Sequence, residues 1–236
     1  MKVNEFIIEK VKKRVPVMAG CGSNSTKESQ ELVQHAASVG ADATLLVSPY
    51  YNKPTQSGLY EHFSSIAKVV PEIDIFLYNI PGRSVVNINL DTMKRLSEIK
   101  NIVGVKDATA DLSLPIETEL TCGPNFIQLS GEDATFLPFL LSGGVGCISV
   151  TANIVPKLCS DMYNFWSEGK IEEAIKINKK LFPLNKVLFA ETSPMPVKFA
   201  LSLMKKCENI FRLPLNGVST STEKKIYEVL SSLELV

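Results

Sequence analysis

The amino-acid sequence predicts an α/β protein in which a parallel sheet is followed by a helical segment. Short apolar runs alternate with longer amphipathic runs six times along the first two thirds of the chain. The apolar residues of the short runs are consecutive, which is typical of parallel strands buried on both faces. Repeated strand–helix units indicate a parallel sheet with right-handed crossovers. From about residue 170 onward the pattern is purely helical.

Each expected element follows from its own pattern. The apolar runs predict strands over residues 15–20, 43–47, 73–78, 102–106, 126–130 and 146–150. Helical periodicity predicts helices over residues 25–39, 57–70, 90–99, 134–141 and 155–168, with a weaker one interrupted by Pro115. Asn24 or Ser25 can cap the helix over 25–39, and Gly40 can end it. The terminal segment should contain helices over 171–189, 196–206 and 222–233.

Composition excludes several classes of protein. The chain has 236 residues, of which 45% are hydrophobic and 21% charged, and this is ordinary for a globular domain. Its formal net charge of zero argues against nucleic-acid or membrane surfaces. No apolar run is long enough to cross a bilayer, and the first residues lack the apolar core of a signal peptide. We therefore expect a cytoplasmic protein without nucleic-acid or membrane partners.

Metal and nucleotide motifs are also missing. The five cysteines are scattered without a Cys-x-x-Cys pair, and there are only two histidines, so neither a zinc site nor a disulfide framework is indicated. The glycines after the first strand lack the third glycine of a dinucleotide motif, and there is no phosphate loop. We expect no metal and no cofactor.

The candidate chemistry lies where the apolar runs close. Reacting groups of α/β barrels project from the carboxyl ends of the strands. Lys106 ends an apolar run, where burial disfavours the ammonium form, and a neutral amine can form a Schiff base with a carbonyl. The alternative is a lysine that reaches solvent or pairs with Asp107. Tyr78 closes the neighbouring strand and could move protons, or it could be a hydrogen-bonded rim tyrosine. Arg83 could clamp a substrate carboxylate, or it could be a solvated loop residue.

Four motifs make the sequence similar to a known family. Residues 48–56 read SPYYNKPTQ, residues 78–84 read YNIPGRS, residues 103–109 read VGVKDAT, and residues 148–153 read ISVTAN. In this order and spacing they resemble the signature stretches of the dihydrodipicolinate synthase family. The similarity extends through residues 194–198 into the terminal helices and covers essentially the whole chain.

This resemblance implies a fold and an activity. The implied fold is a TIM (β/α)8-type barrel over residues 1–169, N-terminally incomplete with about six units, and a C-terminal helical domain over residues 170–236. The implied reaction condenses pyruvate with L-aspartate 4-semialdehyde on the way to diaminopimelate and lysine. The family usually forms homotetramers that are dimers of dimers.

The resemblance also implies roles for individual residues. Lys106 would be the Schiff-base lysine, Tyr78 the proton-relay tyrosine, and Tyr51 the tyrosine that reaches a partner subunit's site. Arg83 would bind the carboxylate of the incoming aldehyde. Gly131 and Ile148 would line the pyruvate pocket. Feedback lysine binds, in regulated members, at positions that match Asn24, Glu28 and Tyr50.

The sequence departs from the family pattern at two places. The family's first strand, first helix and second strand, with its threonine motif, have no counterpart here, and Met1 falls inside the expected second helix. That motif supplies a threonine between the two tyrosines of the relay. Ser193 stands where many members have asparagine and some have serine.

Three functional interpretations remain at this level. The first is the synthase. The second is another pyruvate-dependent aldolase of the N-acetylneuraminate lyase superfamily, although Arg83 argues against the sialic-acid enzyme. The third is an inactive barrel that serves as an interaction protein.

Overall fold

The computed structural model describes residues 1–236, which form two compact units. The first unit comprises residues 1–132 and 138–147, and the second comprises residues 133–137 and 148–236. The expected division into domains at residue 169 stays a prediction. None of the helices combines the length and apolarity that a membrane span requires.

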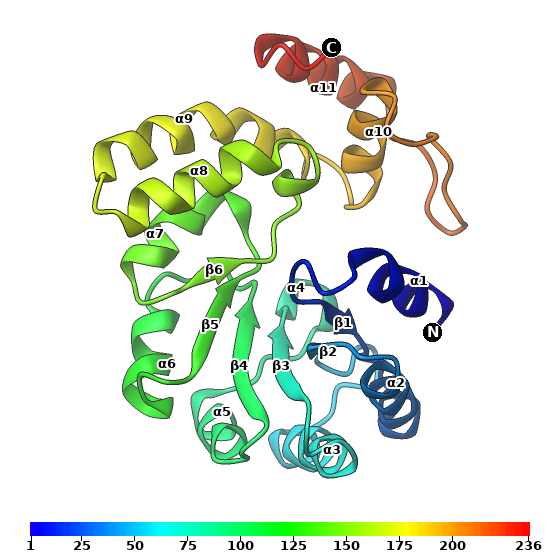
Figure 1. The fold of residues 1–236 in the computed structure, drawn as a ribbon, viewed down its shortest axis with the longest axis vertical. Coiled ribbons are helices and arrows are strands. Elements are labelled where there is room, and N and C mark those ends of the chain that lie inside the picture. Colours follow the sequence, from blue (N-terminus) through cyan, green and yellow to red (C-terminus); the bar gives the residue numbers. More distant parts are fainter. The chain divides into compact units, whose positions relative to one another are not determined.

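The first unit is built on a six-stranded sheet. All neighbouring strands are parallel and the strand order follows the sequence. The strands are β1 (Met18–Gly20), β2 (Ala43–Val47), β3 (Asp74–Asn79), β4 (Ile102–Asp107), β5 (Ile127–Ser130) and β6 (Gly146–Cys147). The predicted parallel arrangement of six strands is confirmed, and the sheet curls like part of a barrel (Figure 1).

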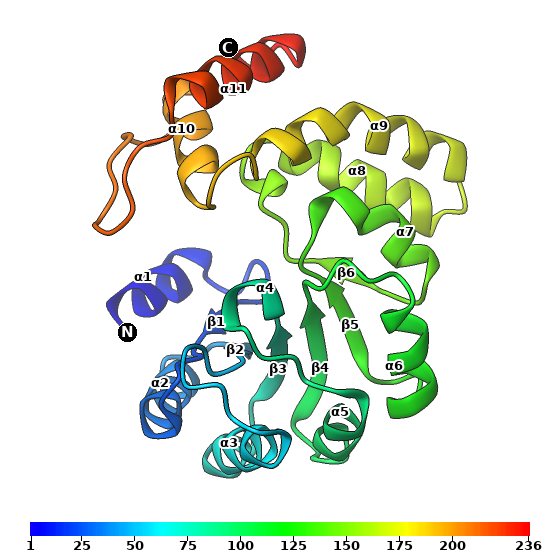
Figure 2. The same ribbon diagram turned by 180° about the vertical axis from the view of Figure 1, so that it is seen from behind.

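Helices connect successive strands and cover one face of this sheet (Figures 1 and 2). They are α2 (Thr26–Ser38), α3 (Gln56–Val69), α5 (Leu90–Ser97) and α6 (Leu114–Cys122). Ser25 caps α2 as expected, because its hydroxyl accepts a hydrogen bond from the Glu28 backbone amide. Side chains of the central strands and of these helices form one continuous apolar core that includes Leu46, Phe63, Ile75 and Leu77.

The remaining elements are short or helical. Before β1 lies α1 (Lys2–Val11), which buries none of its residues. The short helix α4 (Pro81–Ser84) follows β3 and was not predicted. The chain then contains η1 (Asp133–Thr135), α7 (Phe136–Leu141), η2 (Thr151–Asn153), α8 (Pro156–Ser167), α9 (Ile171–Val187), α10 (Met195–Leu203) and α11 (Thr220–Ser232). In the second unit α8 packs on α9, and α11 packs on both α9 and α10.

Three predicted elements need correction. The first strand begins at Met18, because Pro16 has no amide hydrogen and the Val17 amide donates to the Asp42 carboxylate at 2.7 Å. Pro115 lies in the first turn of α6, where its missing amide is harmless, so it begins the helix and does not interrupt it. The last strand ends at Cys147, because the Val150 amide donates to the Asp133 carboxylate at 2.8 Å.

Candidate active site

The carboxyl ends of β3 and β4 bring the central candidates together. The register of this strand pair places Tyr78 beside Lys106 and Asn79 beside Asp107. Lys106 is 9% exposed, and its Nζ lies 4.1 Å from the centroid of the Tyr78 ring. An amine and a phenol thus lie side by side at the edge of the sheet where α/β barrels carry their reacting groups.

Gly131, just beyond β5, leaves room for the Lys106 side chain. A Cβ atom at this position would lie 3.0 Å from Lys106 Cε and 2.6 Å from the Ala108 Cβ. The Gly131 amide also donates to the Asp107 carbonyl at 2.6 Å, which holds the loop against the end of β4. Any larger residue would therefore push on the lysine or on the loop that follows it.

The electrostatic surroundings keep the Tyr78 phenol protonated. Burial raises the pKa of Tyr78 above its usual value of 10.0, the Arg83 guanidinium opposes this, and the Glu132 carboxylate adds to it. A protonated phenol can donate a proton to a leaving hydroxide and take one back later. Arg83 lies in α4, directly after β3, and is exposed.

Asp107 is a buried carboxylate next to the lysine in sequence. It is 7% exposed and accepts hydrogen bonds from the Thr109 hydroxyl at 2.9 Å and the Thr109 amide at 3.2 Å. Burial raises the pKa of Asp107 to about 6, although the two bonds from Thr109 lower it. The Thr109 side chain and backbone thus hold the Asp107 carboxylate in place, whereas the predicted pairing of Asp107 with Lys106 stays a prediction.

The loop after β2 carries the two further tyrosines. Tyr51 is 88% exposed and adopts a left-handed backbone conformation with φ of 73°. The Tyr50 carbonyl accepts a hydrogen bond from the Asn24 side chain at 3.2 Å. Glu28 accepts a short hydrogen bond from the Ser23 hydroxyl. Of the three positions matched to lysine binding, Asn24 and Tyr50 thus lie in the β1–α2 and β2–α3 connections, and Glu28 lies in the first turn of α2.

Ile148 belongs to the second unit, where a buried polar network follows it. The Asp133 carboxylate accepts hydrogen bonds from the Ser149 hydroxyl and from the Val150 and Thr151 amides. The Thr151 hydroxyl donates to Asn185 Oδ1 at 2.7 Å, and Asn185 Nδ2 donates to the Asp133 carbonyl at 3.2 Å. Sequence reasoning missed Asn185. The sequence does contain one indication of its role, because Asn185 is a polar residue on the apolar face of the helix, between Leu181 and Leu188.

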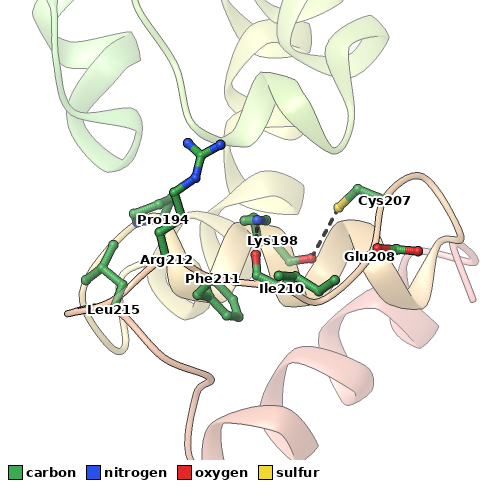
Figure 3. A pocket seen from close by; sticks show the side chains of 8 residues that line it. All are labelled: Pro194, Lys198, Cys207, Glu208, Ile210, Phe211, Arg212 and Leu215. Carbon is green, nitrogen blue, oxygen red and sulfur yellow. Dashed lines mark hydrogen bonds between the residues drawn. The ribbon is translucent and has the colours of Figure 1, made fainter.

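A cleft of about 570 Å³ in the second unit lies between α10 and the chain that follows it. Figure 3 shows Lys198 in the middle of its lining and the Cys207 thiol directed to the Lys198 carbonyl, 3.8 Å away. None of the residues predicted to act in catalysis lines it. All five cysteines are free thiols. No group of three or more His, Cys, Asp or Glu side chains is arranged to hold a metal ion.

Comparison with known proteins gives a consistent result. The profile of the Dihydrodipicolinate synthetase family matches residues 1–233. A 4-hydroxy-tetrahydrodipicolinate synthase of Bradyrhizobium diazoefficiens is 50% identical over 235 residues, a match that covers 100% of this chain and 79% of that protein.

Solved structures agree with the sequence comparison. The chloride-inhibited dihydrodipicolinate synthase of Acinetobacter baumannii, complexed with pyruvate, is 41% identical with a TM-score of 0.96, over 100% of this chain and 80% of that one. The enzyme of Cyanidioschyzon merolae, with lysine bound, is 35% identical with a TM-score of 0.93, over 99% of this chain and 80% of that one. With its six-stranded parallel sheet and its paired lysine and tyrosine, the chain belongs to the dihydrodipicolinate synthetase family.

Proposed function

We propose that the chain condenses pyruvate with L-aspartate 4-semialdehyde to give 4-hydroxy-tetrahydrodipicolinate, in the pathway to diaminopimelate and lysine. The observation that carries this proposal is the buried Lys106 amine, 4.1 Å from the Tyr78 ring, in a member of this family. The relatives that match the whole chain are named for this reaction.

Lys106 starts the reaction as a nucleophile. Its neutral amine attacks the keto carbon of pyruvate, and the carbinolamine loses water to form an imine. Loss of a proton from the pyruvate methyl group then gives an enamine, which attacks the aldehyde carbon of the second substrate. The α-amino group of the second substrate then attacks the imine carbon, which closes the ring, and the C–N bond to Lys106 breaks so that the free amine is regenerated. The amine itself activates the carbonyl, so this chemistry requires neither a metal nor a cofactor.

Tyr78 moves the protons of these steps. A phenol with a raised pKa donates a proton to the hydroxyl that leaves the carbinolamine, and the phenolate takes one back later. Tyr51 is the proposed second tyrosine of the relay, and its side chain is largely exposed. This exposure suits a residue that enters the site of a partner subunit, in a homotetramer built as a dimer of dimers.

The remaining site residues bind the substrates. Arg83 is the proposed partner of the aldehyde's carboxylate, since a guanidinium binds a carboxylate through two parallel hydrogen bonds. Gly131 and Ile148 are proposed to line the pyruvate pocket. Gly131 lies next to the Lys106 side chain, since a Cβ atom at Gly131 would be 3.0 Å from Lys106 Cε.

Three further assignments are part of the proposal. Lysine feedback would act through Asn24, Glu28 and Tyr50, of which Asn24 already bonds the Tyr50 carbonyl. The sheet would represent about six units of a TIM (β/α)8-type barrel, with a C-terminal helical domain over residues 170–236. A cytoplasmic location follows the family.

The test is turnover with defined substrates. The purified chain is mixed with pyruvate and L-aspartate 4-semialdehyde, and the cyclic product is followed after its reduction by a coupled reductase. N-acetylneuraminate serves as the competing substrate for the related lyase reaction. We expect product from the aspartate-derived aldehyde alone. Cleavage of N-acetylneuraminate, or no turnover of either substrate by folded protein, would refute the proposed activity.

A further inference from the structure

The segment over residues 80–89 carries Arg83, and within it the buried Ser84 hydroxyl lies 2.9 Å from both the Ile80 and the Val86 carbonyl oxygens. Its only helix, α4, has four residues, far fewer than an isolated helix needs to persist in water. Val85 ends that helix with φ of 61°, a left-handed conformation that is unfavourable for a β-branched residue. Contacts from elsewhere in the first unit therefore add to these local bonds in holding the segment that carries Arg83.

Asn79 supplies the first of these contacts. It is the last residue of β3 and is 1% exposed. Its Nδ2 donates to Asn87 Oδ1 at 2.8 Å, and its Oδ1 accepts from the Ile88 amide at 3.1 Å. Its carbonyl accepts from the Ala108 amide at 2.9 Å. One buried amide thus ties the far end of the segment to β3, and the same residue's carbonyl ties β3 to the loop after Lys106.

Gln56 supplies the second contact from the start of α3. Its Nε2 donates to the Asn87 carbonyl at 2.8 Å, and its Oε1 accepts from the Asn89 amide at 3.2 Å. The side chains of Val86 and Ile88, which alternate with these two asparagines along the chain, are buried in the core. Hydrogen bonds and buried side chains therefore both hold the 80–89 segment in place. Within it, α4 lies near the carboxyl end of β3 (Figure 1).

We propose that Asn79 and Gln56 are positioning residues that fix the loop bearing Arg83 relative to the Lys106–Tyr78 pair. Neither side chain needs to touch substrate. Each acts by holding the 80–89 segment in the one conformation that presents the guanidinium to the carboxylate of the second substrate. This inference rests on the proposed function of Arg83, and it assigns the residues that determine recognition of the second substrate rather than formation of the pyruvate imine.

Asn101 offers a matched control in the same unit. It is also a buried asparagine, 8% exposed, and its Nδ2 lies near three backbone carbonyls, those of Ala67, Val70 and Ile73 at 3.1, 2.9 and 3.4 Å. It precedes β4 and so lies at the amino end of the strand, away from Lys106 at the other end. Asn101→Ala should lower the melting temperature without changing substrate recognition.

The kinetic experiment compares Asn79→Ala, Gln56→Ala and Asn101→Ala with wild type. In the first two, kcat/KM for L-aspartate 4-semialdehyde should fall roughly 10- to 100-fold, as a small misplacement of a binding group does. The yield of borohydride-trapped pyruvate on Lys106 should stay within about twofold of wild type. Combining Asn79→Ala with Arg83→Ala should cost no more than Arg83→Ala alone, because both changes remove the same contact. Additive losses, or a kinetic profile like that of Asn101→Ala, would overturn the proposal.

Hydrogen exchange of the backbone decides the same question without turnover. Amides of residues 80–89 should exchange faster in Asn79→Ala and in the milder Gln56→Ala than in wild type or Asn101→Ala. Unchanged exchange in this segment would overturn the clamp. If wild type itself shows no turnover, the proposed function fails, and the exchange data still show whether Asn79 and Gln56 hold the loop.

Discussion

In the first unit, the amino ends and the carboxyl ends of strands β2 to β5 differ in the residues that adopt a left-handed backbone conformation. At the amino ends, the left-handed backbone positions before β2 and β5 are glycines, Gly40 and Gly123, which adopt them without strain. At the carboxyl ends, the corresponding positions after β2, β3 and β4 include Tyr51, Val85 and Ala110, with φ between 61° and 73°. Non-glycine residues in this region cost free energy and cluster at functional sites.

The same contrast holds for buried polar groups. At the amino end, the buried Asn101 amide donates to backbone carbonyls and carries no charge. At the carboxyl end, Lys106 and Asp107 are both less than 10% exposed. Buried ionisable groups reduce stability unless other contacts offset their desolvation. The comparison teaches that one edge of the sheet is built for stability and the other for chemistry, and substitutions at the two edges should separate these properties.

The largest effect is expected for Tyr78→Phe. This change removes the phenolic proton but keeps the ring beside Lys106, so kcat should fall by about 10²- to 10⁴-fold, the usual contribution of a proton-transfer group. The melting temperature should change little. Steady-state kinetics with thermal melting as a control checks this. A wild-type kcat in this variant would show that the Tyr78 hydroxyl takes no part in the mechanism.

The next effect concerns the pH dependence of stability at Asp107. Its pKa in the folded protein is about 6, raised from 3.8, so the folded state binds this proton more tightly than the unfolded chain. The stabilisation that protonation gives is therefore present below about pH 4 and is lost as pH rises to about 6. In Asp107→Asn this loss is absent, so the variant's unfolding free energy should gain on wild type by about 3 kcal/mol between pH 4 and 7.

Because His62 also titrates in this pH range, stability has to be compared between Asp107→Asn and wild type and not followed in wild type alone. Burial lowers the pKa of His62 to about 4, so its contribution to stability is lost as pH falls through the same range. The two trends oppose each other in wild type, whereas subtraction removes the histidine, which both proteins share. Urea unfolding at a series of pH values gives the result. A constant difference from pH 4 to pH 7 would mean that Asp107 ionises normally.

A smaller effect is expected for Gly131→Ala. The added methyl group would lie 3.0 Å from Lys106 Cε and 2.6 Å from the Ala108 Cβ, so the variant should lose about 1–3 kcal/mol of stability. Formation of the pyruvate imine should slow as the lysine is displaced. Gly82→Ala is the matched control, because nothing lies within 4 Å of the added atom. Equal behaviour of the two variants would show that the space beside Lys106 is not restricted.

The smallest effect tests the backbone contrast directly. Gly40→Ala should destabilise by about 1–2 kcal/mol, because alanine resists φ of 88°. Val85→Gly should change stability by less than about 1 kcal/mol, because relief of strain is offset by the greater freedom of glycine in the unfolded chain. Denaturant titration measures both. A strongly destabilised Val85→Gly would show that the Val85 side chain, 63% exposed, has a role that strain does not explain.

Much of the sheet could be predicted from the sequence, because parallel strands that are buried on both faces consist of consecutive apolar residues. The run ending at Lys106 predicted both strand β4 and the candidate lysine near its end, and the run ending at Tyr78 predicted the neighbouring strand β3. The last strand was predicted too long, because its continuation gives its amide hydrogens to Asp133 instead of to a neighbouring strand.

The contacts that arrange the site could not be predicted in the same way. The bonds from Asn79 and Gln56 to Asn87 join residues that are 8 and 31 positions apart, and no periodic pattern reports a side-chain amide facing a loop. The left-handed conformations of Tyr51 and Val85 could not be predicted either, because neither residue is a glycine. Sequence patterns record burial, whereas these features depend on individual bonds formed after the chain has folded.

Trapping of the imine tests the central claim most directly. The purified chain is incubated with pyruvate and borohydride, which reduces an imine to a stable secondary amine, and the intact mass and the modified peptide are read by mass spectrometry. Lys106→Met serves as the control. We predict one pyruvate adduct per chain, located on Lys106 and absent from the control. A folded wild-type chain without an adduct, or with an adduct on another lysine that persists in Lys106→Met, would contradict the assignment of Lys106 as the nucleophile.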